Sequence, residues 1–196
     1  MIDFFIEHKT IFVILHALCA AVGLGAVVIT DSLFFQYLKD FKISRKEEET
    51  MNTISKLVWV VIALLIITGT ALFLSAPLDY LAKSKFIVKV VIFAVIVANG
   101  VFLNFWITPV LKRIVFGPVE KQPVLKMRMM RRVAFASGVV SMISWFTVFI
   151  LGSVRSIPVS VGWGLGIYGG VVMSGIIGSQ LLATWMKYGT LFPNKD

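Results

Sequence analysis

The sequence predicts an all-α membrane protein, a single bundle of five transmembrane helices with the N-terminus outside and the C-terminus inside. Hydrophobic residues make up 58% of the 196 residues and charged residues only 15%. This balance leaves too little polar surface for a soluble domain. Five mainly apolar stretches each reach the roughly 20 residues that a helix needs to cross the hydrocarbon core. The charged residues are concentrated between these stretches, as in a polytopic membrane protein.

The five stretches follow one another with short connections, so we expect one transmembrane domain over residues 1–196. The spans are expected at residues 10–37, 57–76, 86–111, 133–154 and 159–186. Pro77, Pro109 and Pro158 lie at or just beyond span ends, where a missing backbone N–H does little harm. Asp3 and Glu7 precede the first span, whereas a signal peptide begins with a basic region. We therefore expect the first span to be a retained helix.

Lys and Arg are distributed unequally between the two sides that these spans define. Fourteen of the 19 lie in the loop after the first span, the loop after the third span and the C-terminal tail, and four lie on the other side. Cytoplasmic loops carry an excess of Lys and Arg, so this asymmetry predicts a cytoplasmic C-terminus, in a bacterial cytoplasmic membrane. It also accounts for the net charge of +9 without nucleic acid. The expected partner is the lipid bilayer.

His16 lies within the first span, about two turns below the outer surface and among small residues. An ionisable residue at this depth is costly and usually faces the bundle interior. Neutral imidazole is a good ligand for iron or copper, which makes His16 a candidate ligand of haem b or a metal. Alternatively, His16 hydrogen-bonds to a neighbouring helix. Cys19 follows one turn later and is a candidate second copper ligand, with packing as the alternative.

Three further polar residues fall inside spans. Lys89 is one turn deeper than Lys85 and is a candidate charge partner for an anionic substrate group or a haem propionate. Asn99 is a candidate polar support for a cofactor, and asparagine can also hydrogen-bond across helices. Asp31 lies towards the cytoplasmic end of the first span. We expect it to pair with a basic loop residue or to serve as a proton or cation site.

The fifth span carries a small residue at every fourth position. These residues are Gly162, Gly166, Gly170, Ser174 and Gly178. Residues four apart share one helix face, so the pattern predicts close helix packing. The contact is either within the chain or with a homodimer partner or another membrane protein.

Short motifs in the first three spans resemble the copper-resistance D family, whose superfamily includes the small membrane protoporphyrinogen oxidases. In the first span the resemblance rests on residues 15–21 with Gly23 and Gly25. In the second and third spans it rests on Leu64, Thr68, Gly69, Lys85, Lys89, Asn99, Gly100 and Pro109. The resemblance covers residues 11–111. It implies a helical bundle with a haem or copper role, in which His16 is the position that carries over. Asn99 stands where the oxidases have a second histidine.

The sequence contains no Walker loop, dinucleotide fingerprint, nucleophile elbow or HExxH motif, which argues against soluble-type hydrolytic or nucleotide chemistry. We therefore predict a small membrane protein that binds haem or copper through His16, in redox or metal handling. Two alternatives stay open. One is a cofactor-free transporter or channel lined by Asp31, Lys89 and Asn99. The other is a scaffold or accessory subunit that docks a partner through the glycine face.

Overall fold

The computed structural model describes residues 2–40, 44–110, 124–154 and 158–185, and the regular structure in these ranges is entirely helical. Five of the helices are long and apolar enough to cross a membrane. Their spans are Lys9–Gln36, Arg45–Ser75, Ser84–Val110, Met129–Ser153 and Val161–Thr184. At 1.5 Å per residue, each is longer than a hydrocarbon core of about 30 Å. The predicted all-α bundle with five membrane-spanning helices is confirmed.

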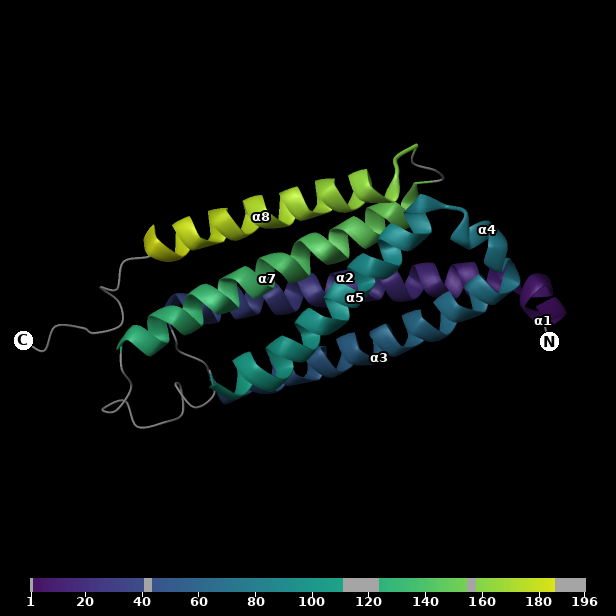
Figure 1. Ribbon diagram of the computed structural model, residues 1–196. Coiled ribbons are helices and arrows are strands. Elements are labelled where there is room, and N and C mark those ends of the chain that lie inside the picture. Colours follow the sequence, from purple (N-terminus) through teal and green to yellow (C-terminus); the bar gives the residue numbers. More distant parts are fainter. Residues whose placement is uncertain (1, 41–43, 111–123, 155–157, 186–196) are drawn as a thin grey trace, which may run out of the picture.

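The elements run back and forth along the bundle (Figure 1). In chain order they are α1 (Ile2–Glu7), α2 (Lys9–Asp40), α3 (Arg45–Ser75), α4 (Pro77–Leu81), α5 (Ser84–Phe102), η1 (Leu103–Ile107), α7 (Val124–Ser153) and α8 (Val161–Trp185). The short helix α4 connects α3 to α5, and η1 is a π-helix that continues α5. Helix α2 begins at one end of the bundle and α8 finishes at the other, as expected for an odd number of spans.

Helix α3 begins twelve residues before the predicted span, because the helix extends beyond its apolar part. Its start is fixed by a capping box. The Ser44 hydroxyl accepts from the backbone N–H of Glu47 at 3.2 Å, and the Glu47 carboxylate accepts from the backbone N–H of Ser44 at 2.7 Å. Helix α7 likewise begins at Val124, before the predicted span. Hydropathy marks the part of a helix that lies in lipid, whereas capping marks where the helix begins.

The helices form two groups that meet in the middle of the bundle. Helix α2 packs along α3, while α7 packs along both α5 and α8, and contacts between α2 and α7 join the groups. An apolar cluster of buried side chains lies where the two groups meet. Its members are Val27, Val61, Ile62, Leu65, Ile96 and Trp145. Trp145 is only 3% exposed, although it is the largest of the set.

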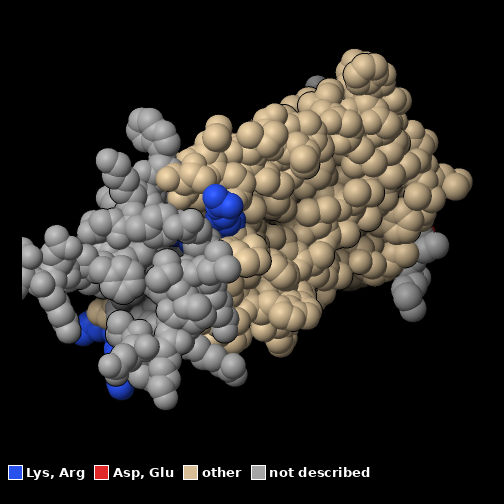
Figure 2. Space-filling view, turned by 60° about the vertical axis from the view of Figure 1, so that its left-hand side comes forward, with Lys and Arg blue, Asp and Glu red and all other residues tan. Residues whose placement is uncertain are grey.

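Basic residues gather at the end of the bundle where α3 and α7 begin. Figure 2 shows Lys and Arg at this end, beside a broad uncharged surface that extends over most of the face in view. An uncharged belt of this kind fits lipid contact. Seven of the 19 basic residues on which the predicted charge asymmetry rests lie outside the described residues: Lys42, Lys112, Arg113, Lys121, Arg155, Lys187 and Lys195. The orientation with the N-terminus outside stays a prediction.

Candidate functional site

A cavity of about 110 Å³ lies between the two helix groups, in the half of the bundle where α3 begins and α2 ends. A single water needs roughly 10–15 Å³ of such space, so the cavity accepts several waters or a small organic molecule. It is lined by Val27, Thr30, Asp31 and Phe34 of α2, by Met51, Ser55, Val58, Trp59 and Ile62 of α3, by Ile96 and Gly100 of α5, by Leu103 and Asn104 of η1, by Thr108, and by Ser141 and Trp145 of α7. Every helix of the bundle except α8 and the short α1 and α4 contributes to the wall.

The π-helix η1 shapes one wall of the cavity. In this turn the backbone N–H of Thr108 donates to the carbonyl of Leu103, five residues back instead of four. Such single π-turns are rare and occur often at functional sites, because the extra residue changes the direction of neighbouring side chains. Here Asn104 lies within the π-turn and Thr108 directly after it, and both line the cavity. Asn104 is exposed, so the cavity is not fully enclosed by protein.

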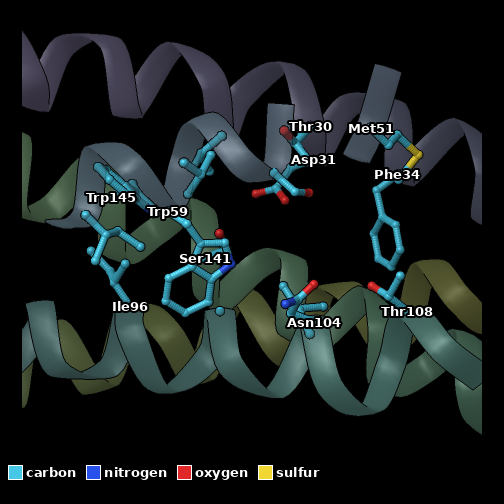
Figure 3. Close-up of a pocket in the computed structure, with 16 residues that line it drawn as sticks. Thr30, Asp31, Phe34, Met51, Trp59, Ile96, Asn104, Thr108, Ser141 and Trp145 are labelled. Atoms are coloured by element: carbon cyan, nitrogen blue, oxygen red, sulfur yellow. The ribbon is translucent and has the colours of Figure 1, made fainter. Parts of the chain in front are cut away.

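Asp31 places a carboxylate in this cavity. Figure 3 shows its oxygens directed from α2 into the space between the helices, with Asn104 on the opposite wall. The Ser141 hydroxyl of α7 is a hydrogen-bond partner of the Asp31 side chain. Oδ2 of Asp31 is buried and has no hydrogen-bond partner in the described ranges of the chain. The expected pairing with a basic loop residue is therefore not seen in the described part of the chain.

The other walls combine a few polar groups with aromatic rings. Thr30 uses its hydroxyl proton within α2, where it donates to the carbonyl of Ala26 at 2.8 Å. The aromatic rings belong to three different helices: Phe34, Trp59 and Trp145. Of the sixteen described residues that line the cavity, Asp31 alone is ionisable. The cavity thus offers a single negative charge against a largely apolar surface.

His16 lies outside this cavity and is bound to α3. Its Nδ1 is 2.8 Å from Oγ1 of Thr68, and that hydroxyl donates its proton to the carbonyl of Leu64 at 2.7 Å. Since the hydroxyl proton is already used, the neutral imidazole carries its proton on Nδ1 and has a free lone pair on Nε2. A β-carbon at Gly69 would lie 3.4 Å from Cε1 of His16, so this glycine leaves room for the ring. The contact between His16 and Thr68 matches the alternative predicted for His16, a hydrogen bond to a neighbouring helix.

Lys89 lies within electrostatic reach of His16, between α5 and α7. Its Nζ would be 3.7 Å from a β-carbon at Gly152, near the end of α7. Lys85, one turn earlier, donates from Nζ to the backbone carbonyl of Val154. A lysine at this point neutralises the negative end of the helix dipole. Lys85 therefore binds the end of α7 in addition to lying near the membrane surface.

Cys19 packs against the apolar cluster that contains Trp145 and is half-buried there. Among the described residues, His, Cys, Asp and Glu form no group of three or more that could hold a metal ion. His16 and Cys19 are thus left without a third ligand of these types in the described ranges. Binding of copper by His16 and Cys19 stays a prediction.

Asn99 joins α5 to α7 through both ends of its amide. Its Nδ2 donates to the carbonyl of Ser137 at 3.0 Å, and the Ser137 hydroxyl donates to Oδ1 of Asn99 at 2.6 Å. The predicted hydrogen bond across helices is confirmed. A structural role accounts for this amide, and the support of a cofactor stays a prediction.

The predicted glycine face of α8 points away from the rest of the chain. Its five residues are all exposed, and a β-carbon on any of its four glycines would meet no atom within 4 Å. Helix α8 instead packs through Gly164 and Gly175. A β-carbon at Gly175 would lie 2.7 Å from both Ile143 and Val139 of α7. The glycine face therefore makes no close contact within the described part of the chain, which was one of the two predicted alternatives. The other alternative, contact with a second copy or another membrane protein, stays a prediction.

Several residues of the cavity were not singled out from the sequence. Ser141 is the clearest, since it is buried on α7 and bonds to Asp31. A signal for it exists, because Ser137, Ser141 and Ser144 recur at spacings of four and three within one span. Small polar residues on one helix face indicate the side that faces the bundle interior. No comparable sequence pattern singles out Trp59 as a cavity residue.

No protein-family model matches this chain, and no curated protein or solved structure shows significant similarity to it. The resemblance to the copper-resistance D family accordingly stays a prediction.

Proposed function

We propose that this chain is a membrane carrier that binds a small cation at Asp31 and moves it across the bilayer. The observation that carries the proposal is the buried Oδ2 of Asp31, which has no hydrogen-bond partner among the described residues and lies at the wall of a cavity. An uncompensated carboxylate within a membrane protein is costly. A bound cation or proton would remove that cost.

The surroundings of Asp31 support a binding role over a purely structural one. Ser141 of α7 is a hydrogen-bond partner of the Asp31 side chain, and Oδ2 of Asp31 has no partner among the described residues. The π-turn at Leu103–Ile107 directs polar side chains to the same space. The cavity also lies where the α2–α3 pair meets the α5–α7 pair. Relative motion of two such helix groups is a common way for carriers to expose a site to either side.

The proposal is tested by uptake into proteoliposomes. Radiolabelled sodium, methylammonium and tetramethylammonium are supplied outside vesicles that contain the wild-type protein, the Asp31→Asn variant or the Asp79→Asn variant. Asp79 is the matched control, because it is an exposed carboxylate on α4, away from the cavity. We expect saturable uptake of at least one cation, lost in Asp31→Asn and kept in Asp79→Asn. Equal uptake by wild type and Asp31→Asn for all three cations would refute the proposal.

A second candidate function is the binding of haem b through His16. It is favoured by the hydrogen bond to Thr68, which leaves Nε2 of the neutral imidazole free as an axial ligand. Lys89 is near enough to act as a charge partner for a propionate. The test is an absorption spectrum of protein purified after expression with ample haem. A Soret band that is lost in His16→Ala supports this candidate, and a blank spectrum of the wild type removes it.

A further inference from the structure

We infer that the cation held at Asp31 is a small organic ammonium ion of single positive charge, not a metal ion. This inference rests on the proposed function, since it specifies the ligand of the same cavity. Three properties of the cavity wall lead to it: its charge, the placement of its oxygen atoms and its aromatic surface.

The charge of the wall sets the charge of the ligand. Among the described residues that line the cavity, Asp31 is the one acidic side chain, and none of these residues is Lys, Arg or His. A divalent ion would leave a positive charge uncompensated in a low-dielectric site. Calcium sites, in comparison, collect six to eight oxygen ligands and usually several carboxylates. The single carboxylate of this wall matches a monovalent cation.

Aliphatic and aromatic side chains separate the oxygen-bearing side chains of the described wall, an arrangement that suits an organic cation better than a bare alkali metal ion. Such an ion enters a protein site by exchanging its hydration shell for a ring of oxygens. Here the oxygen-bearing side chains come from α2, α3, η1 and α7, and aliphatic side chains lie among them. The hydroxyl proton of Thr30 is used within its own helix, so the Thr30 oxygen is left to accept from an N–H group of the ligand. An ammonium ion needs fewer oxygens, because one face can meet the carboxylate while its alkyl groups contact the apolar wall.

The aromatic surface fits the alkyl groups of an ammonium ion. Trp59, Trp145 and Phe34 all line the space beside Asp31 (Figure 3). Ring faces attract organic cations, and tryptophan is the strongest of the three ring types in this respect. The Trp59 ring lies beside Gly100 of α5, where a β-carbon would be 3.7 Å from the indole. A carboxylate beside fixed aromatic rings is a typical recognition site for alkylated ammonium groups.

The experiment measures equilibrium binding of radiolabelled tetramethylammonium to the full chain in detergent. We expect saturable binding that is displaced by unlabelled tetramethylammonium or methylammonium, but not by the same concentration of sodium or potassium chloride. Binding is lost in Asp31→Asn and unchanged in Asp79→Asn. Trp59→Leu weakens binding by roughly 2- to 30-fold, the range expected for one cation–π contact. Trp59→Tyr, which keeps an aromatic face, restores most of the affinity and shows that the site still folds.

The outcomes separate the ligand class from the proposed carrier function. If sodium or potassium displaces tetramethylammonium as well as methylammonium does, or if Trp59→Leu binds as tightly as wild type, the ligand class is wrong. Uptake of sodium alone that depends on Asp31 would also overturn the ligand class and leave the carrier function standing. Binding of tetramethylammonium without any uptake that depends on Asp31 would uphold the ligand class and refute the carrier function.

Discussion

The indole ring of Trp145 lies directly against the backbone of Gly23. A β-carbon at Gly23 would be 2.7 Å from two atoms of the ring and 2.8 Å from Cγ1 of Val61. Trp145 belongs both to the apolar cluster and to the wall of the Asp31 cavity. This contact therefore joins α2 to α7 at the boundary between the packed middle of the bundle and the cavity.

Replacing Gly23 by alanine should destabilise the bundle. The ring of Trp145 is buried and cannot move away cheaply, so we expect the substitution to lower the free energy of unfolding by about 1–3 kcal/mol, as for an overpacked core. The matched control is Gly166→Ala on α8, where a β-carbon meets nothing within 4 Å. That change should be neutral or stabilising, because alanine is the better helix former. Thermal unfolding in detergent checks both, and an unchanged melting temperature for Gly23→Ala would contradict the packing described.

The hydrogen bonds between Asn99 and Ser137 should couple α5 to α7. We expect Asn99→Leu and Ser137→Ala each to lower the free energy of unfolding by about 0.5–2 kcal/mol, as for interhelical hydrogen bonds in membrane proteins. The double variant should lose less than the sum of the two, because either change alone breaks the pair. The measurement is a double-mutant cycle of unfolding free energies in detergent. Strictly additive losses would show that the two side chains do not interact.

The imidazole of His16 should have its proton on Nδ1 when it is neutral. This follows from Thr68, whose hydroxyl donates to the carbonyl of Leu64 and can only accept from His16. Nδ1 of His8 lies 3.0 Å from the carbonyl of Phe4 and should also carry a proton, so the signals are assigned with a His8→Gln variant. In that variant, nitrogen NMR of protein labelled at histidine should show a protonated Nδ1 and a bare Nε2 for His16. In Thr68→Val the acceptor is gone, and the two tautomers should become mixed. Nε2 protonation in the wild type would contradict the assigned hydrogen bond and remove the free ligand position.

The five spans could be predicted because hydropathy is a local property of each segment. Asp31 and His16 could also be singled out, since an ionisable residue in an apolar stretch stands out by itself. The cavity around Asp31 could not be predicted in the same way. It depends on how the α2–α3 pair meets the α5–α7 pair, and on a change of hydrogen-bond pattern at Leu103–Ile107 that has no sequence signature.

The glycine residues of α8 are a second case in which the sequence predicts a pattern but not the contact that it makes. Steps of four residues show that Gly162, Gly166 and Gly170 share a face, but not what that face contacts. In the structure the face is exposed, and the close contacts with α7 and α5 are made by Gly175 and Gly164, which the pattern does not include. Periodicity identifies a helix face, whereas only packing identifies its neighbour.

The proposal that Asp31 binds a cation is tested most directly by chemical labelling of its carboxyl group. Dicyclohexylcarbodiimide reacts with carboxyl groups in apolar surroundings, and mass spectrometry of peptides locates the modified residue. We predict labelling at Asp31 that falls several-fold, and saturably, as tetramethylammonium chloride is added, while exposed acids such as Asp79 show no such protection. Labelling of Asp31 that is the same in sodium, potassium, methylammonium and tetramethylammonium chloride would contradict a cation site at this residue.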